Sequence, residues 1–159
     1  MQKKSKMTFR KAVIGDIKPI QKLINDLAKR NEMLPRTLNQ LYENLRDFWV
    51  CEAGGEVRAC CALHIMWEDL AEIRSVAVSQ NFQGKGIGKK MVNLCLKEAR
   101  QLEIPRVFLL TYKSDFFKKF GFQIVDKNTL PHKVWTDCIN CIKFPDCGEV
   151  AMILNLSSC

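Results

Sequence analysis

Residues that could bind a phosphate group are concentrated between Glu72 and Lys90, where an alternating apolar run precedes three glycines at every second position. The run predicts a strand, and the apolar stripe after the glycines predicts a helix. Glycine lets the backbone approach a ligand closely, and the free N–H groups at a helix N-terminus attract anionic oxygens. We therefore predict a phosphate-binding loop at residues 83–88. A turn that only reverses the chain is the alternative.

Two other phosphate-binding motifs do not fit these residues. A Walker loop has four residues between its glycines and a Ser or Thr after its lysine. Here Gly84 and Gly88 are separated by three residues, and Lys89 is followed by Lys90. A dinucleotide fingerprint needs a third glycine where Lys89 stands and an acidic residue about 20 positions later. The pattern that remains is Gln83-x-x-Gly-x-Gly88.

That hexapeptide, placed after a strand with an acidic residue, resembles the acetyl-CoA pyrophosphate loop of the GNAT acyltransferase superfamily. The resemblance implies acetyl-CoA as the acetyl donor. It also implies that main-chain groups of the strand hold the pantetheine arm, while the loop and the first helical turn hold the pyrophosphate. The cofactor-binding residues that it implies are Val76, Ala77, Val78, Gln83, Gly84, Lys85, Gly86, Ile87, Gly88, Lys89, Phe116 and Phe117.

Composition is that of one globular domain. The chain has 159 residues, 47% of them hydrophobic, which is enough for a sizeable core. Its formal charge of +8 suits a polyanionic ligand. The basic residues are not interleaved with stacking aromatics, so we expect no nucleic-acid partner. No apolar run approaches the roughly 20 residues of a membrane span, and no signal core follows the basic N-terminus. We expect a cytoplasmic protein without a membrane partner.

The remaining helices and strands are predicted from the spacing of apolar residues and from the capping and turn residues that flank each segment. Asp16 and Thr37 are expected to cap two helices, a third helix starts near Gly86, and Ser114 is expected to cap a fourth at 115–120. Strands are predicted at 8–13, 48–53, 57–67, 69–78, 106–111, 122–125 and 149–156. This order resembles the GNAT fold. We therefore expect an α/β (α+β) domain over 1–159, a mixed central sheet of about six to seven strands flanked by about four helices, with a cysteine-rich insertion at 126–148.

Two charged residues lie on the predicted central strand. Side chains alternate across a strand, so Glu72 and Arg74 are expected on one face with Val76 and Val78. They could form an ion pair and nothing more. The family resemblance instead implies that Glu72 is the general base. A carboxylate substrate needs cationic donors near this base, and Arg74 is our first choice.

Two further cations are candidates for the substrate pocket. Arg36 lies in the turn between the first two helices, and Lys133 lies in the insertion. Both segments could fold over the base. A solvated arginine is the alternative for Arg36.

The stretch from Phe116 to Phe122 resembles the second signature of the family, in which a tyrosine usually stands four residues before a glycine. Here the glycine is Gly121, and Phe117 occupies the tyrosine position. A phenylalanine cannot protonate the departing thiolate. Tyr112 is the nearest hydroxyl in sequence, and solvent is the alternative, since a thiol of pKa about 8.5 leaves without full protonation.

Seven of the eight cysteines form two groups. The first group falls within predicted strands and a helix, where we expect buried thiols that act as small apolar side chains. Its members are Cys51, Cys60, Cys61 and Cys95. The second group, Cys138, Cys141 and Cys147 with His132 upstream, lies in the insertion. Reduced structural thiols are our interpretation there, so we assign no metal ligands; a zinc site and a redox switch are the alternatives.

Several segments together carry a narrower resemblance. They are Leu34-Pro-Arg36, Glu72-Ile-Arg-Ser-Val-Ala-Val78, Phe116-Phe-x-x-Phe-Gly-Phe122 and Leu130-Pro-His-Lys-Val-Trp-x-Asp-Cys138. They are similar to the short bacterial amino-acid N-acetyltransferases of the N-acetylglutamate synthase type, which lack the regulatory domain of longer synthases. The resemblance implies transfer of acetyl to L-glutamate, the first step of arginine biosynthesis. Another GNAT enzyme for a polyamine, antibiotic or protein amine, and a non-catalytic acetyl-CoA-binding module, are the alternatives. The chain could also form a homodimer.

Overall fold

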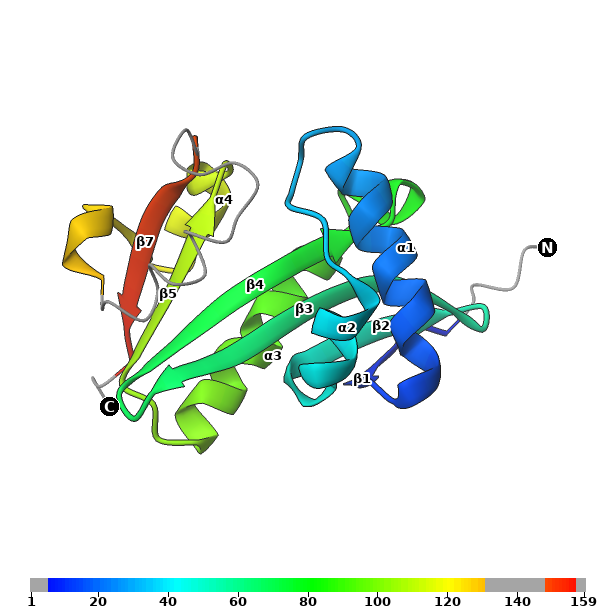
Figure 1. The fold of residues 1–159 in the computed structure, drawn as a ribbon, viewed down its shortest axis with the longest axis horizontal. Helices are drawn as coiled ribbons and strands as arrows, with labels where there is room; N and C mark the ends of the chain where they lie inside the picture. Colours follow the sequence, from blue (N-terminus) through cyan, green and yellow to red (C-terminus); the bar gives the residue numbers. More distant parts are fainter. Residues whose placement is uncertain (1–5, 131–147, 157–159) are drawn as a thin grey trace. The chain divides into compact units, whose positions relative to one another are not determined.

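The computed structural model describes residues 6–130 and 148–156. Within them lie seven strands and four α-helices (Figure 1). The strands are β1 Thr8–Lys11, β2 Phe48–Ala53, β3 Glu56–Trp67, β4 Leu70–Val78, β5 Arg106–Thr111, β6 Gln123–Val125 and β7 Val150–Asn155. The helices are α1 Ile17–Ala28, α2 Leu38–Glu43, α3 Ile87–Gln101 and α4 Ser114–Lys118.

The strands form a mixed sheet in the order β1-β2-β3-β4-β5-β7-β6. The β4–β5 pair is parallel and places Glu72 opposite Phe108. The pairs β1–β2, β2–β3, β5–β7 and β6–β7 are antiparallel. Seven strands and four helices confirm the predicted α/β fold class.

The chain forms two compact units. Unit 1 comprises the chain up to His64 together with Ile73–Glu98. Unit 2 comprises Ile65–Glu72 and the chain from Ala99 onward. Strand β4 passes from unit 2 into unit 1 between Glu72 and Ile73, so Glu72 belongs to unit 2 and Arg74 to unit 1.

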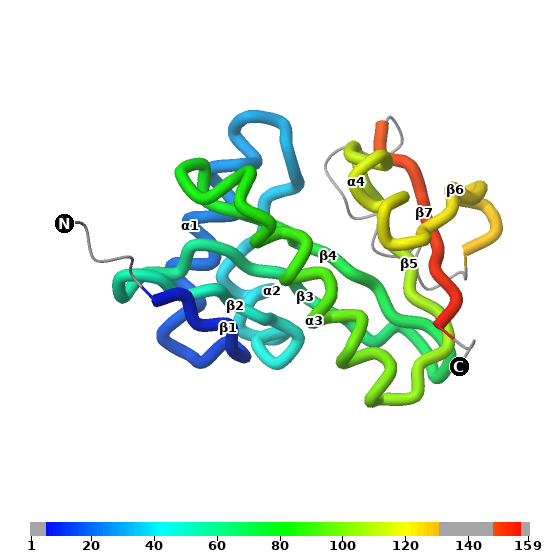
Figure 2. Tube along the Cα trace, turned by 180° about the vertical axis from the view of Figure 1, so that it is seen from behind, coloured from blue at the N-terminus to red at the C-terminus, as the bar shows by residue number. Residues whose placement is uncertain are grey.

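The core of unit 1 lies under the apolar face of α1. As the three- and four-residue spacing predicts, four α1 side chains are buried: Ile17, Ile20, Ile24 and Leu27. They belong to one cluster with Leu41 of α2, Phe48 of β2 and Cys60 of β3. Figure 1 shows α1 and α2 on this face of β2 and β3, and Figure 2, seen from behind, shows α3 on the other face.

Local sequence signals fix several turns of unit 1. Gly54 and Gly55, with φ angles of 61° and 76°, form the hairpin turn between β2 and β3, as a pair of glycines between two strands indicates. Thr37 caps α2 as predicted: its hydroxyl accepts the Gln40 N–H at 3.2 Å, and the Gln40 side chain accepts the Thr37 N–H at 3.0 Å.

Two predicted caps differ in detail. Asp16 precedes α1, but its carboxylate accepts no bond from that helix; it accepts from Arg10 and from the Val13 N–H. Ser114 is wrong as the cap of α4, because it is the first helical residue and Lys113 precedes it. The Thr111 hydroxyl accepts the Lys113 N–H at 2.8 Å and orders that turn in its place.

Buried thiols fill part of unit 1, as predicted. Cys51, Cys60, Cys61 and Cys95 are free and buried. Cys95 Sγ donates to Cys61 Sγ at 3.3 Å and so links α3 to β3. Burial raises the pKa of Cys60 to about 12, which makes this thiol an inert apolar side chain.

The core of unit 2 lies under β4, β5 and β7. Leu70, Phe108 and Ala151 are buried there with Met66 and Leu130. An aromatic group lies on α4 and just after it: the centre of the Phe117 ring is 4.9 Å from that of Phe116 and 5.9 Å from that of Phe122, both edge to face.

Candidate acetyl-transfer site

Strand β4 carries the predicted general base, Glu72, and the predicted substrate-binding residue, Arg74. Glu72 is only 8% exposed, and Arg74 is half-buried. Ser75 has a φ angle of 56°, which interrupts the alternation of a regular strand. Regular alternation of side chains therefore ends at Ser75. Strand geometry alone does not place Val76 and Val78 on the face expected for Glu72 and Arg74.

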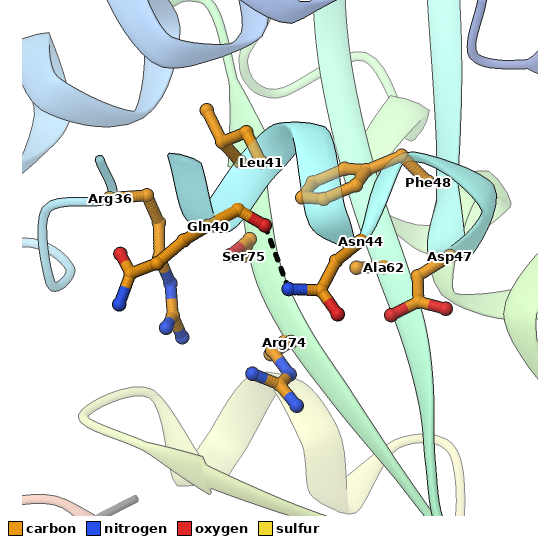
Figure 3. Close-up of a pocket in the computed structure, with 9 residues that line it drawn as sticks. All are labelled: Arg36, Gln40, Leu41, Asn44, Asp47, Phe48, Ala62, Arg74 and Ser75. Atoms are coloured by element: carbon orange, nitrogen blue, oxygen red, sulfur yellow. Dashed lines mark hydrogen bonds between the residues drawn. The ribbon is translucent and has the colours of Figure 1, made fainter. Parts of the chain in front are cut away.

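A pocket in unit 1 brings Arg36 and Arg74 together (Figure 3). Arg74 comes from β4, and Arg36 precedes the cap of α2. The pocket contains about 250 Å³ of empty space, part of which is open solvent, so it is a depression in the surface and not an enclosed cavity. Its walls are Arg36, Gln40, Leu41, Asn44, Asp47, Phe48, Ala62, Arg74 and Ser75.

Polar groups of this pocket that the sequence analysis missed come from α2 and the turn after it. The Asn44 amide donates to the Gln40 carbonyl at 2.7 Å, which leaves its oxygen turned away from that carbonyl, as Figure 3 shows. The Asp47 carboxylate shares a hydrogen bond with His64 Nδ1. The four-residue spacing of Gln40 and Asn44 was the available signal, because it places both on one helical face.

The glycine loop has the backbone conformation that its sequence requires. Gly84 and Gly86 have φ angles of 76° and 78°, which residues other than glycine rarely adopt. No atom lies within 4 Å of an added Cβ at either position. The loop from Gly84 to Gly86 is exposed, and α3 starts immediately after it. Its open backbone at a helix N-terminus fits an anionic ligand.

Charge around the loop is positive. The first turn of α3 contains no acidic residue. Lys85 Nζ lies 5.2 Å from the centre of the Phe82 ring, whose centre is also 4.9 Å from the Arg58 guanidinium. Lys89 is exposed beside the loop. These cations would attract the phosphates of coenzyme A.

The other predicted residues belong to unit 2 or lie outside the described residues. Tyr112 is 40% exposed, and Phe117 is 5% exposed within its aromatic group. Their roles stay predictions. Lys133 lies outside the described residues, as do His132 and the three cysteines of the insertion. Across 6–130 and 148–156, no three His, Cys, Asp or Glu side chains are grouped so as to hold a metal ion.

A mixed sheet with a glycine loop between a central strand and the next helix defines an acetyltransferase of the GNAT type, and the family comparison agrees. The model of the acetyltransferase (GNAT) family matches residues 18–122. The chain belongs to this family and is an N-acetyltransferase.

Two relatives match most of the chain. An uncharacterized N-acetyltransferase of Chlorobaculum tepidum is 37% identical over 92% of this chain and 95% of its own length. An amino-acid acetyltransferase of Mycobacterium tuberculosis is 38% identical over 80% of this chain and 75% of its own.

Solved structures extend the likeness. A Mycobacterium tuberculosis protein in complex with CoA has a TM-score of 0.80 at 33% identity, over 94% of this chain and 99% of its own. An N-acetylglutamate synthase of Neisseria gonorrhoeae, complexed with coenzyme A and N-acetyl-glutamate, has a TM-score of 0.86 at 26% identity. This chain is covered to 98%, but it spans only 36% of that longer chain.

None of the helices that the structure describes is long and apolar enough to cross a membrane.

Proposed function

We propose that this N-acetyltransferase transfers the acetyl group of acetyl-CoA to the α-amino group of a free amino acid, with L-glutamate as the first substrate. The observation that carries the proposal is the pocket where Arg36 and Arg74 meet, since two guanidinium groups suit an anionic amino acid. The names of the mycobacterial and gonococcal relatives support the same substrate class.

Acetyl-CoA is the acetyl donor, and it supplies the thioester carbonyl that the amine attacks. Structural neighbours bound to coenzyme A support this donor. The backbone N–H groups from Gly84 to Gly88, where α3 begins, and the exposed Lys85 and Lys89 would hold the pyrophosphate. Main-chain groups of residues 76–78 would pair with the pantetheine arm like an added strand. The Val76 N–H would stabilise the negative charge that develops on the carbonyl oxygen.

The amine must lose a proton before it can attack. Glu72 is the proposed general base, either directly or through one water. Arg74, two residues further along β4, would pair with a substrate carboxylate. Arg36 would pair with the other carboxylate of a dicarboxylic amino acid. Pairing of the substrate carboxylates with guanidinium groups would orient the amine, and fixing two reactants in place can contribute about 7–11 kcal/mol to lowering the barrier.

The leaving thiolate needs at most one proton. Tyr112 is the proposed donor, and solvent is the alternative because Phe117 replaces the tyrosine of the family. With L-glutamate as substrate the product would be N-acetyl-L-glutamate, which would place the enzyme at the first step of arginine biosynthesis.

Thiol release from acetyl-CoA, measured with a panel of amines, tests the proposal. The panel contains L-glutamate, other free amino acids, polyamines and a lysine peptide. Selective turnover of L-glutamate supports the proposal. Turnover of a polyamine or peptide alone would replace the substrate class, and binding of acetyl-CoA without any transfer would favour a non-catalytic module.

A further inference from the structure

The backbone of Arg36 is held by two side chains of α1. Asn25 Oδ1 accepts the Arg36 N–H at 3.2 Å, and Gln21 Nε2 donates to the Arg36 carbonyl at 3.3 Å. Gln21 and Asn25 are four residues apart, so they lie one above the other on the same face of the helix. Both are half-buried. The two peptide groups that flank the Arg36 side chain are thus both fixed from outside their own segment.

The segment of Arg36 has no regular structure that could fix it otherwise. Residues 34–36 lie between α1 and α2, outside any helix or strand. The α2 cap binds the Thr37 N–H, which belongs to the peptide group after Arg36, and α1 binds the Arg36 N–H and the Arg36 carbonyl. From this fixed point the Arg36 side chain extends into the pocket, as Figure 3 shows.

Packing of α1 does not require these two amides. The apolar side of the helix already fills the core through its buried isoleucines and Leu27. Gln21 and Asn25 instead supply one donor and one acceptor where the neighbouring segment presents one acceptor and one donor. Their chemistry matches the backbone of Arg36 and not the core.

We propose that Gln21 and Asn25 are positioning residues that hold Arg36 in place for substrate recognition. The inference rests on the proposed function, in which Arg36 binds a substrate carboxylate. A guanidinium on an irregular segment would otherwise lose much conformational freedom on binding, and a fixed backbone removes part of that loss beforehand.

The opposite roles of the two amides make the inference testable by single substitutions. Asn25 acts as an acceptor, so Asn25→Asp keeps its bond while Asn25→Ala removes it. Gln21 acts as a donor, so Gln21→Glu presents only acceptor oxygens to a carbonyl and removes its bond. The exposed Lys22, on the same helix, provides the control Lys22→Ala.

Steady-state kinetics give the first measurement. Asn25→Ala and Gln21→Glu are expected to raise the KM for the amino acid about 3- to 10-fold, the effect of one hydrogen bond of ordinary strength. The KM for acetyl-CoA and the melting temperature should stay near wild type. Asn25→Asp and Lys22→Ala should behave as wild type in all three. A rise in both KM values together with a lower melting temperature would show a merely structural role.

The variant Arg36→Ala distinguishes a failure of the positioning role of Gln21 and Asn25 from a failure of the substrate-binding role of Arg36. If it raises the amino-acid KM while Asn25→Ala and Gln21→Glu do not, the positioning role is overturned and the proposed function stands. If Arg36→Ala leaves that KM unchanged, the assignment of Arg36 is overturned and the positioning role with it.

Amide hydrogen exchange of Arg36 gives a readout that does not depend on activity. The Arg36 N–H should be protected in the wild type, in Asn25→Asp and in Lys22→Ala, and should exchange faster in Asn25→Ala. Equal exchange in Asn25→Ala and the wild type would overturn the inference.

Discussion

The side-chain amide of Gln83 donates a hydrogen bond of 3.0 Å to the backbone carbonyl of Val78. This bond joins the start of the glycine loop to the last residue of β4. The Ser79 N–H in turn donates to the Arg58 carbonyl at 2.7 Å, which ties the same strand end to β3. Gln83 was expected to bind the cofactor, and its position gives it a second role, because its hydrogen bond fixes the shape of the loop before any ligand arrives.

Loss of this bond should weaken acetyl-CoA binding. In Gln83→Ala, and equally in Gln83→Glu, nothing donates to the Val78 carbonyl, so the loop must be ordered by the ligand itself. We expect the KM for acetyl-CoA to rise about 3- to 10-fold at saturating amino acid. Gln80→Ala is the matched control, since Gln80 is exposed in the same connection. An acetyl-CoA KM in Gln83→Ala that equals the control would contradict this role.

Alanine at Gly86 should damage the loop through its backbone. The φ angle of 78° costs a residue with a Cβ about 1–2 kcal/mol, although no atom lies within 4 Å of the added methyl. The damage is therefore conformational and not steric. Gly86→Ala should raise the dissociation constant of acetyl-CoA, measured by calorimetry, about 5- to 30-fold. Gly15→Ala is the control, because Gly15 has equally open surroundings and a φ angle outside the left-handed region. Equal affinity in both variants would refute the argument.

Much of the scaffold could be predicted because its signals are local. Strands β2 and β5 begin and end where the sequence predicts, since alternation and flanking turns mark both limits. The Thr37 cap and the Gly54-Gly55 turn depend only on neighbouring residues. The left-handed Ser75 could not be predicted, because the surrounding sheet and not its residue type sets that conformation.

The pocket was harder to predict than the fold. Arg36 and Arg74 were candidates separately, but their meeting depends on the path of the connection before α2. Gln21 and Asn25 fix that path. From sequence alone, polar residues on an amphipathic helix are assigned to its solvent-exposed face, so the role of these half-buried amides could not be predicted. Asp47 and His64 come from different elements, so no spacing rule joins them.

Replacement of Glu72 should reduce the rate of transfer rather than binding. Glu72→Gln keeps the shape of a side chain that is 8% exposed but removes its capacity to take a proton. We expect kcat to fall about 10²- to 10⁴-fold, the usual contribution of a general base. Acetyl-CoA binding by calorimetry should be retained. Glu68→Gln is the control, because Glu68 is exposed in the turn before β4. Unchanged turnover in Glu72→Gln would rule out catalysis by this carboxylate.

Arg74 should govern the affinity for the amino acid. Arg74→Ala is expected to raise the L-glutamate KM about 10- to 100-fold, because a charge-assisted hydrogen bond is lost. The acetyl-CoA KM should stay near wild type. Arg74→Lys should recover only part of the loss, since an ammonium cannot pair with both carboxylate oxygens at once. Arg46→Ala, at an exposed arginine before Asp47, is the control. An equal rise in both KM values of Arg74→Ala would refute a substrate-specific role.

Asp16 should make the stability of the fold depend on pH. It is 6% exposed, and its carboxylate accepts from Arg10 at 2.7 Å and from the Val13 N–H at 2.8 Å. Burial alone would raise the pKa of Asp16, but these hydrogen bonds and the Arg10 charge outweigh it, so the pKa lies below the ordinary value of 3.8. Arg10 also donates to Glu52 at 2.7 Å, so the same guanidinium ties β1 to β2 and to the start of α1.

The sign of the pH effect follows from this lowered pKa. A carboxylate that ionises more readily in the folded chain stabilises the fold fully above the unfolded pKa, and it loses this contribution as the pH falls through the folded pKa. Asp16→Asn should therefore lower the free energy of unfolding by about 1–3 kcal/mol at pH 7. The difference from wild type should shrink as the pH falls below 3.8. Denaturant titrations at pH 7, 5, 4 and 3 measure it. Asp26→Asn is the control, since Asp26 is exposed on α1 and lies 3.9 Å from its partner Lys29. A gap between Asp16→Asn and wild type that stays constant down to pH 3 would show that packing, and not the charge of Asp16, accounts for its contribution.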